Sequence, residues 1–236
     1  MIFRIDTLPS YNGTCLSGYV TSYGEMYGMN QPFLQFYGDE NGNILSIMDG
    51  TVTVCWDECN LEELSLFLQA QSWHTLRTTA KAASYLSDKW GNRVMLQPVM
   101  RYIGAQKHFV ECDASPRELY PFLASVFDAM PPFDVWYTDI CYRIRHGFCR
   151  ICAVKKEKQV VSSAMTVAEW ENGAVLGAVA TDKNHRRQGY ASRCVMALVA
   201  QLQKSDIFIC PKTQAAARLY EQLGFVVCDE IGKIER

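Results

Sequence analysis

One stretch of the chain, from Ala174 to Leu202, restricts the possible folds more than any other. It opens with A-V-L-G-A-V-A-T (Ala174–Thr181), which is apolar at nearly every position and therefore predicts a strand buried on both faces. The segment N-H-R-R-Q-G-Y-A-S-R (Asn184–Arg193) comes next and places two arginines beside a glycine. The apolar residues after it recur on one side of a helix. A buried strand that leads through a glycine loop into an amphipathic helix indicates an α/β protein.

The second half of the chain, residues 107–236, is predicted to form one complete domain. Ser115, Pro116 and Glu118 are typical of a capped helix start, and Gly147 is typical of a helix end. Three strands with short connections follow and should pair antiparallel, which makes the predicted sheet mixed. The predicted elements are a strand at 107–113, helices at 115–128 and 134–147, strands at 148–155, 159–168 and 174–181, a helix after Gly189, a strand at 206–210, a helix at 214–223 and a strand from Phe225.

The first half, residues 1–106, repeats the last seven of these elements after a loop-rich start. The segment A-A-S-Y-L…G (82–91) even resembles A-A-R-L-Y…G (216–224). We therefore predict a second, distantly related domain at residues 1–106. Its predicted elements are strands at 32–38, 44–48 and 51–56, a helix at 60–70, a strand at 73–79, a helix at 80–91 and a strand at 92–100.

Charge and hydropathy exclude several classes of function. The formal net charge is -2, which argues against a broadly basic nucleic-acid surface. No apolar run is long enough to span a bilayer, and residues 1–30 lack the pattern of a secretory signal. We expect neither a nucleic acid nor a membrane as a partner, and we place the protein in the cytoplasm.

The ten cysteines are interpreted as reduced thiols, since no secretory signal precedes them. Cys149 and Cys152 lie three apart in a predicted strand, so their side chains should face opposite ways and cannot readily share a metal ion. Cys55 and Cys59 have no matching second pair. We expect no metal site and interpret the cysteines as small apolar residues.

The loop from Arg186 to Ala191 has the features of an anion-binding site. The first turn of a helix exposes unpaired N–H groups and the positive end of the helix dipole. Gly189 would let a ligand approach the backbone closely, and two arginines supply donors suited to phosphate oxygens. Taken alone, the six residues are better interpreted as a plain surface loop that contains a glycine. Their place between a buried strand and an amphipathic helix favours a site for phosphate or pyrophosphate.

Two motifs resemble the GNAT superfamily of acyl-CoA N-acyltransferases. R-R-Q-G-Y-A (Arg186–Ala191) is similar to the family signature Arg/Gln-x-x-Gly-x-Gly/Ala, and A-A-R-L-Y-E-Q-L-G-F-V (Ala216–Val226) resembles the helix–strand segment that follows it. The element order of residues 107–236 is that of a complete GNAT domain. The resemblance implies a mixed α/β GNAT fold in tandem with a degenerate N-terminal GNAT-like copy, and acetyl-CoA as the cosubstrate, with no metal.

The resemblance also implies roles for individual residues. Tyr220 stands at the position of the general acid that protonates the departing thiolate, and a phenol is protonated at neutral pH. The alternative is that Tyr220 is a core aromatic. Thr213 stands where many members carry an asparagine that contacts the cofactor arm. The implied cofactor-binding residues are Val179, Ala180, Thr181, Arg186, Arg187, Gln188, Gly189, Tyr190, Ala191, Ser192 and Thr213.

The acceptor and the general base are less well marked. In GNAT folds the two early helices shape the acceptor pocket, and here they offer Trp136, Tyr137 and Asp139, with Phe133 and Tyr142 nearby. Ordinary helix packing with a surface aspartate is the favoured interpretation of these residues, since fold analogy alone is weak evidence for a binding role. The strand 174–181 carries no glutamate, and Glu169 and Glu171 are interpreted as a solvated hairpin tip.

The matching helix start in the first half reads C-W-D-E-C-N-L-E-E-L, without a glycine. Asn60 and Glu63 predict a capping box, and Asp57, Glu58 and Glu62 would repel a pyrophosphate. We therefore expect no coenzyme A site there. The chain is predicted to be an N-acetyltransferase that acts on a primary amine of a small molecule or peptide, as a monomer or homodimer. The alternative is a non-catalytic CoA-binding regulatory or partner protein.

Overall fold

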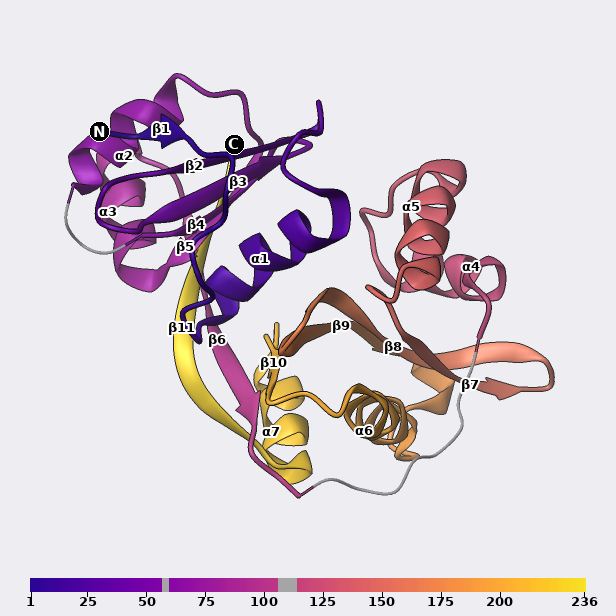
Figure 1. The fold of residues 1–236 in the computed structure, drawn as a ribbon. Coiled ribbons are helices and arrows are strands. Elements are labelled where there is room, and N and C mark those ends of the chain that lie inside the picture. The colour runs from indigo at the N-terminus through magenta and orange to yellow at the C-terminus, as the bar shows by residue number, and fades with distance from the viewer. Residues whose placement is uncertain (57–59, 106–113) are drawn as a thin grey trace. The chain divides into compact units, whose positions relative to one another are not determined.

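The computed structural model describes residues 1–56, 60–105 and 114–236, which form two compact units (Figure 1). The first unit contains Met1–Val99 together with Val227–Arg236, and the second contains Met100–Val226. The sequence predicts one boundary between the two domains at residue 106. In the structure the first unit also includes the end of the chain, because the C-terminal strand β11 (Phe225–Glu235) pairs antiparallel with β5 (Thr75–Thr79). The strand predicted at 107–113 lies outside the described residues.

The second unit contains most of the elements predicted for the second half. Its sheet runs in the order β6-β10-β9-β8-β7, and β9 pairs antiparallel with β8 and parallel with β10, so the predicted mixed sheet is confirmed. The elements are the end of β6 (Val94–Tyr102), α4 (Pro116–Val126), α5 (Phe133–Arg145), β7 (Ile151–Lys156), β8 (Gln159–Trp170), β9 (Gly173–Thr181), a 3-10 helix (Lys183–His185), α6 (Tyr190–Leu202), β10 (Asp206–Ile209) and α7 (Gln214–Leu223).

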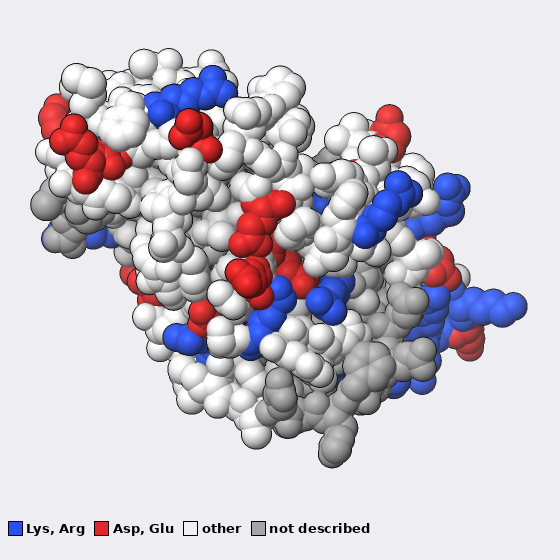
Figure 2. Space-filling model, viewed as in Figure 1, with Lys and Arg blue, Asp and Glu red and all other residues white. Residues whose placement is uncertain are grey.

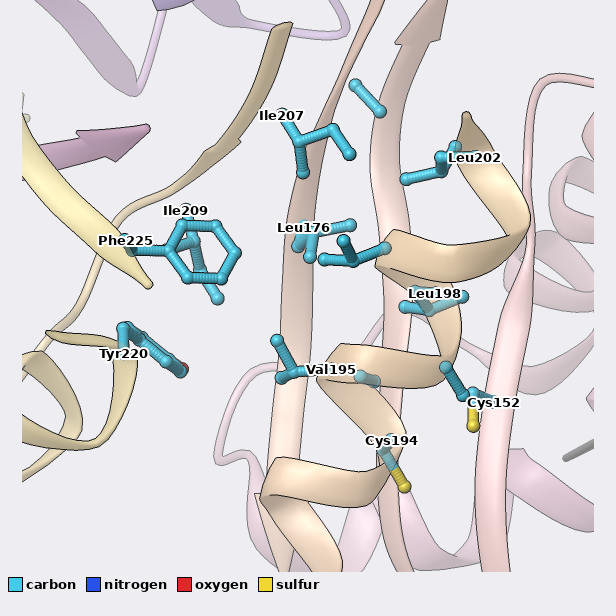
Figure 3. Close-up of a cluster of buried hydrophobic side chains, with 14 of the residues drawn as sticks. Cys152, Leu176, Cys194, Val195, Leu198, Leu202, Ile207, Ile209, Tyr220 and Phe225 are labelled. Atoms are coloured by element: carbon cyan, nitrogen blue, oxygen red, sulfur yellow. The ribbon is translucent and has the colours of Figure 1, made fainter. Parts of the chain in front are cut away.

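Helices cover both faces of this sheet, as Figure 1 shows for α6 on one side and for α4 and α5 on the other. The predicted stripe of α6 is buried from Cys194 to Leu202 and packs on Leu176, Ile207 and Ile209 (Figure 3). The opposite face of β9 and its neighbours packs against Leu119 and other residues of α4 and α5. Both faces of β9 are therefore covered along much of its length, as its uninterrupted apolar sequence predicts.

The predicted capping box at the start of α4 is present. The Ser115 side chain accepts a hydrogen bond from the Glu118 N–H, and the Glu118 carboxylate accepts one from the Ser115 N–H. Lys155, 2.7 Å from Glu118, and these hydrogen bonds lower the pKa of Glu118 to about 2. The last turn of helix α5 carries Arg143 and Arg145, whose positive charges interact favourably with the negative end of the helix dipole.

The first unit carries one helix that the sequence did not predict. Helix α1 (Cys15–Tyr27) begins at Thr14, whose hydroxyl accepts from the Ser17 N–H, and ends at Gly28. It contacts β3, β4 and β5 and buries most of its side chains. Its two internal glycines, Gly18 and Gly24, lower the helix propensity of a segment that the sequence places in a loop-rich start. Burial against the sheet outweighs that propensity.

The remaining elements of the first unit follow the predicted order. Helices α2 and α3 pack on the face of the sheet that carries Leu45, Val52, Val54 and Leu76. Within the unit the sheet runs in the order β1-β2-β3-β4-β5-β11. The elements not yet given are β1 (Phe3–Arg4), β2 (Leu34–Gly38), β3 (Ile44–Met48), β4 (Thr51–Cys55), α2 (Leu61–Gln69) and α3 (Ala80–Trp90).

Glu169 is not part of a solvated hairpin tip, so that interpretation was wrong. Strand β8 continues through it to Trp170, and Glu169 is only 1% exposed. Arg150 donates two hydrogen bonds to its carboxylate, from Nε at 3.2 Å and from Nη2 at 3.1 Å. Lys204 Nζ lies 3.5 Å from the same oxygen. A buried carboxylate in a strand is acceptable here because two cations compensate its charge.

We expect Glu169→Gln to lower the free energy of unfolding by about 2 kcal/mol. The change leaves Arg150 and Lys204 without their counter-charge, and the effect is smaller than for a fully buried pair because the Arg150 side chain is 37% exposed. Urea denaturation at pH 7 measures this. Glu157→Gln, in an exposed turn, is the control and should change stability by less than about 0.5 kcal/mol. Equal stability of the two variants would contradict a structural role for Glu169.

The two cysteines of the 149–152 spacing face opposite sides of the sheet, as predicted. Cys149 belongs to the cluster under α4 and α5, and Cys152 belongs to the cluster under α6. Seven cysteines of the described residues are free. Cys152 is disulfide-bonded, so the expectation of reduced thiols is wrong at this position. Cys59 lies outside the described residues.

Candidate coenzyme A site

Strand β9 loses its neighbour partway along its length, and this opens the site. The ladder between β9 and β10 covers only four residue pairs, from Gly173–Asp206 to Leu176–Ile209. Strand β10 ends at Ile209, whereas β9 continues to Thr181. Beyond Leu176, one edge of β9 therefore faces away from β8 without a β10 residue in register. Backbone groups on such an edge can pair with an extended ligand.

A bulge in β9 sets the direction of the backbone groups along this open edge. The register with β8 shifts between Ser163–Ala180 and Met165–Gly177, so β9 has one residue more than β8 in this interval. Ala178 takes up the extra length with φ of +48°, in the left-handed region. That conformation costs an L-residue other than glycine about 1–2 kcal/mol. Strain of this kind is concentrated at functional sites.

The loop after β9 ends in an open helix N-terminus. Gly189 is the N-cap of α6 with φ of +78° and ψ of +4°, and no side chain caps the helix. A Cβ atom on Gly189 would meet no protein atom within 4 Å, so space is open beside the backbone. The first turn, Tyr190 to Ser192, contains no acidic residue. Its N–H groups and the helix dipole are available to an anion.

Asp182 fixes the shape of this loop from within. Its carboxylate accepts from the Asn184 N–H at 2.8 Å and lies 3.1 Å from Nδ1 of His185. The pKa of Asp182 is lowered, mainly by the Asn184 hydrogen bond and then by His185. Arg186 donates from Nε to the Thr181 carbonyl at 3.2 Å. The loop is thereby held in place before any ligand binds, which reduces the entropy cost of binding.

A cavity of about 700 Å³ joins the open edge of β9 to this loop. Its lining includes three arginines and one histidine, and no aspartate or glutamate among the described residues. On the face in view in Figure 2, Lys and Arg are interspersed with Asp and Glu. The lining residues are Val126, Val179, Ala180, Thr181, His185, Arg186, Arg187, Gly189, Tyr190, Ala191, Ser192, Ala215, Ala216, Arg218, Leu219, Tyr220 and Gln222.

Tyr220 lies at the inner part of this cavity and is 5% exposed. Its ring packs on Phe225, and in Figure 3 its hydroxyl points toward the strand that carries Leu176. No protein group in the described part of the chain hydrogen-bonds this hydroxyl. Burial, and to a lesser degree Cys210, raises the pKa of Tyr220 to about 12. The phenol therefore stays protonated at physiological pH and can donate a proton into the cavity.

Nine of the eleven residues predicted to bind the cofactor line this cavity. Gln188 lies instead beside a neighbouring hollow of about 450 Å³, which shares His185 and Tyr190 with the main cavity. Thr213 is the N-cap of α7, where its hydroxyl accepts from the Ala216 N–H at 3.2 Å. Thr213 thus caps the start of α7 at the position where many family members carry asparagine.

The three residues predicted to bind the acceptor do not line the cavity. Trp136 packs against Tyr120, and Tyr137 stacks on Phe133. Asp139 lies 3.6 Å from Nη1 of Arg143, one helical turn away in α5. The only contribution to the lining from α4 or α5 within the described residues is Val126. Helix packing explains the aromatic residues without an acceptor.

Arg218 is a lining residue that sequence reasoning did not identify. It stands on α7 two positions before Tyr220 and adds a third arginine to the lining. The sequence could have indicated this residue, because Arg218 is an exposed cation within the A-A-R-L-Y motif. Two other missed residues, Ser162 and Ser163, hydrogen-bond the bulged part of β9. The sequence feature that could have indicated them is a pair of polar residues within the otherwise apolar strand segment V-V-S-S-A-M.

The matching helix start in the first unit has a different structure. Helix α2 has Glu62 and Glu63 in its first turn, and Asn60 makes no side-chain cap. The predicted capping box is therefore wrong, because Asn60 adopts a left-handed conformation and Glu63 accepts from the Ile2 N–H instead. Asp57 and Glu58 lie outside the described residues. The two glutamates leave this N-terminus unfavourable for an anion.

Comparisons with known proteins agree with this geometry. Residues 114–225 match the model of the Acetyltransferase (GNAT) family. None of the curated proteins matches the sequence. No helix of the described residues is long and apolar enough to cross a membrane.

Several solved structures share the fold at low sequence identity. A GCN5-related N-acetyltransferase from Sphaerobacter thermophilus superposes with a TM-score of 0.61 at 12% identity, covering 98% of this chain and 96% of that one. A GNAT-family acetyltransferase from Novosphingobium aromaticivorans gives 0.60 at 14% identity, with 92% and 95% covered. A tandem GNAT protein from the clavulanic acid biosynthesis pathway gives 0.53 at 12% identity, with 97% and 90% covered. The chain has the mixed α/β GNAT fold, and its residues 114–225 form a domain of the Acetyltransferase (GNAT) family.

Proposed function

We propose that the chain is an N-acetyltransferase that transfers an acetyl group from acetyl-CoA to a primary amine of a small molecule or peptide. The observation that carries the proposal is the cationic cavity of about 700 Å³ between the open edge of β9 and the N-terminus of α6. Coenzyme A carries negative charge on its pyrophosphate and on its 3′-phosphate, and this lining supplies arginines and helix N–H groups without a carboxylate.

The pyrophosphate would lie against Gly189 and the first turn of α6, with Arg186 and Arg187 beside it. The pantetheine arm would extend along Val179–Thr181 as an added strand, which places the thioester near Tyr220. This orientation follows from the order in which β9, the glycine loop and Tyr220 line the cavity.

The reaction is a direct acyl transfer. The neutral amine nitrogen attacks the thioester carbon, a C–N bond forms and the C–S bond breaks. Tyr220 donates its proton to the departing sulfur, and the proton lost by the amine nitrogen returns to the phenolate through solvent. The products are an N-acetyl amide and free coenzyme A. No enzyme nucleophile is required for this chemistry.

Release of free thiol from acetyl-CoA in the presence of an amine library tests the proposal. Amine-dependent thiol release with formation of the acetyl amide supports an enzyme. Binding of acetyl-CoA without turnover of any amine supports the non-catalytic CoA-binding alternative. Absence of binding would refute both.

We further propose that the first unit, Met1–Val99 with Val227–Arg236, is a degenerate GNAT-like module without a coenzyme A site. Calorimetric titration with acetyl-CoA should then give one site per chain, because the acidic start of α2 disfavours a pyrophosphate. Glu62→Gln/Glu63→Gln should leave the stoichiometry at one and is the control for an effect of charge alone. Two equivalent sites per chain would contradict the proposal.

The pH dependence of turnover should follow from the raised pKa of Tyr220. A general acid is active while protonated, and burial moves the loss of the Tyr220 proton up to about pH 12. With saturating acetyl-CoA, kcat/KM for the amine should rise with pH as the amine loses its proton and should then stay level to at least about pH 10. A fall in rate that begins below pH 9, with the enzyme still folded, would contradict this assignment.

A further inference from the structure

Two adjacent serines in β8, Ser162 and Ser163, have no role in the mechanism described so far. Both are fully buried in a strand segment whose other residues are apolar. Ser162 Oγ donates to the Ala180 carbonyl at 2.8 Å, and Ser163 Oγ donates to the Ala178 carbonyl at 3.0 Å. The two serines thus hold the same strand that lines the cavity, at the residues on either side of Val179.

The hydrogen bond from Ser163 falls on the strained residue of the bulge. Ala178 has φ of +48°, a conformation that alanine disfavours and that glycine adopts freely. The bulge shifts the register here, so the Ala178 carbonyl lies outside the regular ladder between the paired positions Gly177 and Ala180. Ser163 supplies the partner that this carbonyl would otherwise lack in the buried interior.

The direction of the Ala178 carbonyl determines the direction of the next N–H. The described residues contain no cis peptide bond, so each carbonyl and the following N–H point to opposite sides of the strand. Because the Ala178 carbonyl is turned toward β8, the Val179 N–H points away from β8, toward the edge that β10 leaves open. The same argument applies to the Ala180 carbonyl and the Thr181 N–H.

We propose that Ser163 is a positioning residue that aims the Val179 N–H at the thioester carbonyl oxygen of acetyl-CoA. This inference rests on the proposed function. During attack by the amine, that oxygen gains negative charge, and an N–H fixed in advance stabilises it more in the transition state than in the ground state. Ser162 fixes the Thr181 N–H in the same way, one step farther along the pantetheine arm.

Infrared spectroscopy of bound [1-13C]acetyl-CoA tests the inference without an acceptor amine. In the wild-type protein the carbonyl stretch should shift to lower frequency than in solution, because the Val179 N–H polarises the thioester. Ser163→Ala should lose at least half of this shift and lower kcat about tenfold. Its Kd for acetyl-CoA should stay within about threefold, since the pyrophosphate cradle is untouched. Ser22→Ala, which also removes a buried hydroxyl bonded to a backbone carbonyl, is the matched control and should keep the full shift.

Ala178→Gly provides a rescue that a merely structural serine would not show. Glycine holds the left-handed conformation without help, so Ser163→Ala/Ala178→Gly should regain most of the shift and come within about threefold of the wild-type kcat. If Ser163→Ala does not fold, Ser163→Cys replaces it; a partial loss of the shift supports the role, because a thiol is a weaker donor than a hydroxyl, and a full shift contradicts it. A full carbonyl shift in folded Ser163→Ala, or no rescue by Ala178→Gly, overturns the inference and leaves the proposed function intact. Failure of the wild-type protein to bind acetyl-CoA overturns both.

Discussion

Gly189→Val should weaken acetyl-CoA binding at least 100-fold, which corresponds to about 2.7 kcal/mol. Gly189 lines the cavity, and a Cβ atom there would meet no protein atom within 4 Å, so the new side chain would occupy space open to the ligand. A valine in that space keeps a pyrophosphate from the N–H groups of Tyr190 and Ala191. Calorimetric titration with acetyl-CoA measures the loss.

The control must carry the same backbone strain, because Gly189 has φ of +78°. Gly147 has φ of +80°, also has no protein atom within 4 Å of its Cβ position, and lies outside the cavity. Gly147→Val should therefore lower the melting temperature about as much as Gly189→Val while keeping the wild-type affinity. If folded Gly189→Val binds acetyl-CoA within threefold of the wild-type protein, the pyrophosphate does not approach at this glycine.

The regular elements of the fold could be predicted because periodicity and capping signals agree with tertiary burial. The stripe of α6 and the capping box at Ser115 are examples in which local preference and packing favour the same structure. Helix α1 shows the opposite case, since the internal glycines Gly18 and Gly24 lower its propensity and only contact with the sheet holds it helical. No single-sequence pattern reports that contact.

Two other differences between the sequence-based predictions and the structure arise from contacts with residues far away in the sequence. Glu169 was interpreted as solvated because its neighbours in sequence form a turn, yet the residues that neutralise it, Arg150 and Lys204, are 19 and 35 positions away. Asn60 and Glu63 have the spacing of a capping box, but Glu63 instead accepts from the N–H of Ile2. A spacing rule describes which residues can meet within one element and not which distant group competes for them.

The cavity that we propose for coenzyme A could be predicted only in part, because some of its residues also depend on long-range contacts. Its glycine loop and β9 are contiguous in sequence, so the motif located them directly. Arg218 reaches the cavity from α7, whereas Ser163 does not line it and contacts β9 from β8 at a bulge that shifts the register. The aromatic residues offered by α5 make ring contacts with Tyr120 and Phe133, and their role toward an acceptor stays a prediction. Where the position of a side chain depends on strand register or on the rotation of a helix, its role can be assigned only from the structure.

Tyr220→Phe should lower kcat about 100-fold, because general acid catalysis typically contributes a factor of 10²–10⁴. Phenylalanine keeps the ring that packs on Phe225 and removes only the hydroxyl, so the fold and the acetyl-CoA affinity should change little. KM for acetyl-CoA should stay within about threefold. Initial rates of thiol release at pH 8 with the best amine of the library measure both constants.

Tyr102→Phe is the matched control for this prediction. Its ring also packs on Phe225, at 5.2 Å between centroids, and its hydroxyl donates to the Ala105 carbonyl rather than facing the cavity. It should keep kcat within about twofold. A solvent deuterium isotope effect on kcat should be present in the wild-type protein and in Tyr102→Phe and reduced in Tyr220→Phe, because only the last variant lacks the proton that reaches sulfur. If Tyr220→Phe turns over at the wild-type rate, Tyr220 is not the general acid. Its role is then structural, because it is buried and its ring packs on Phe225.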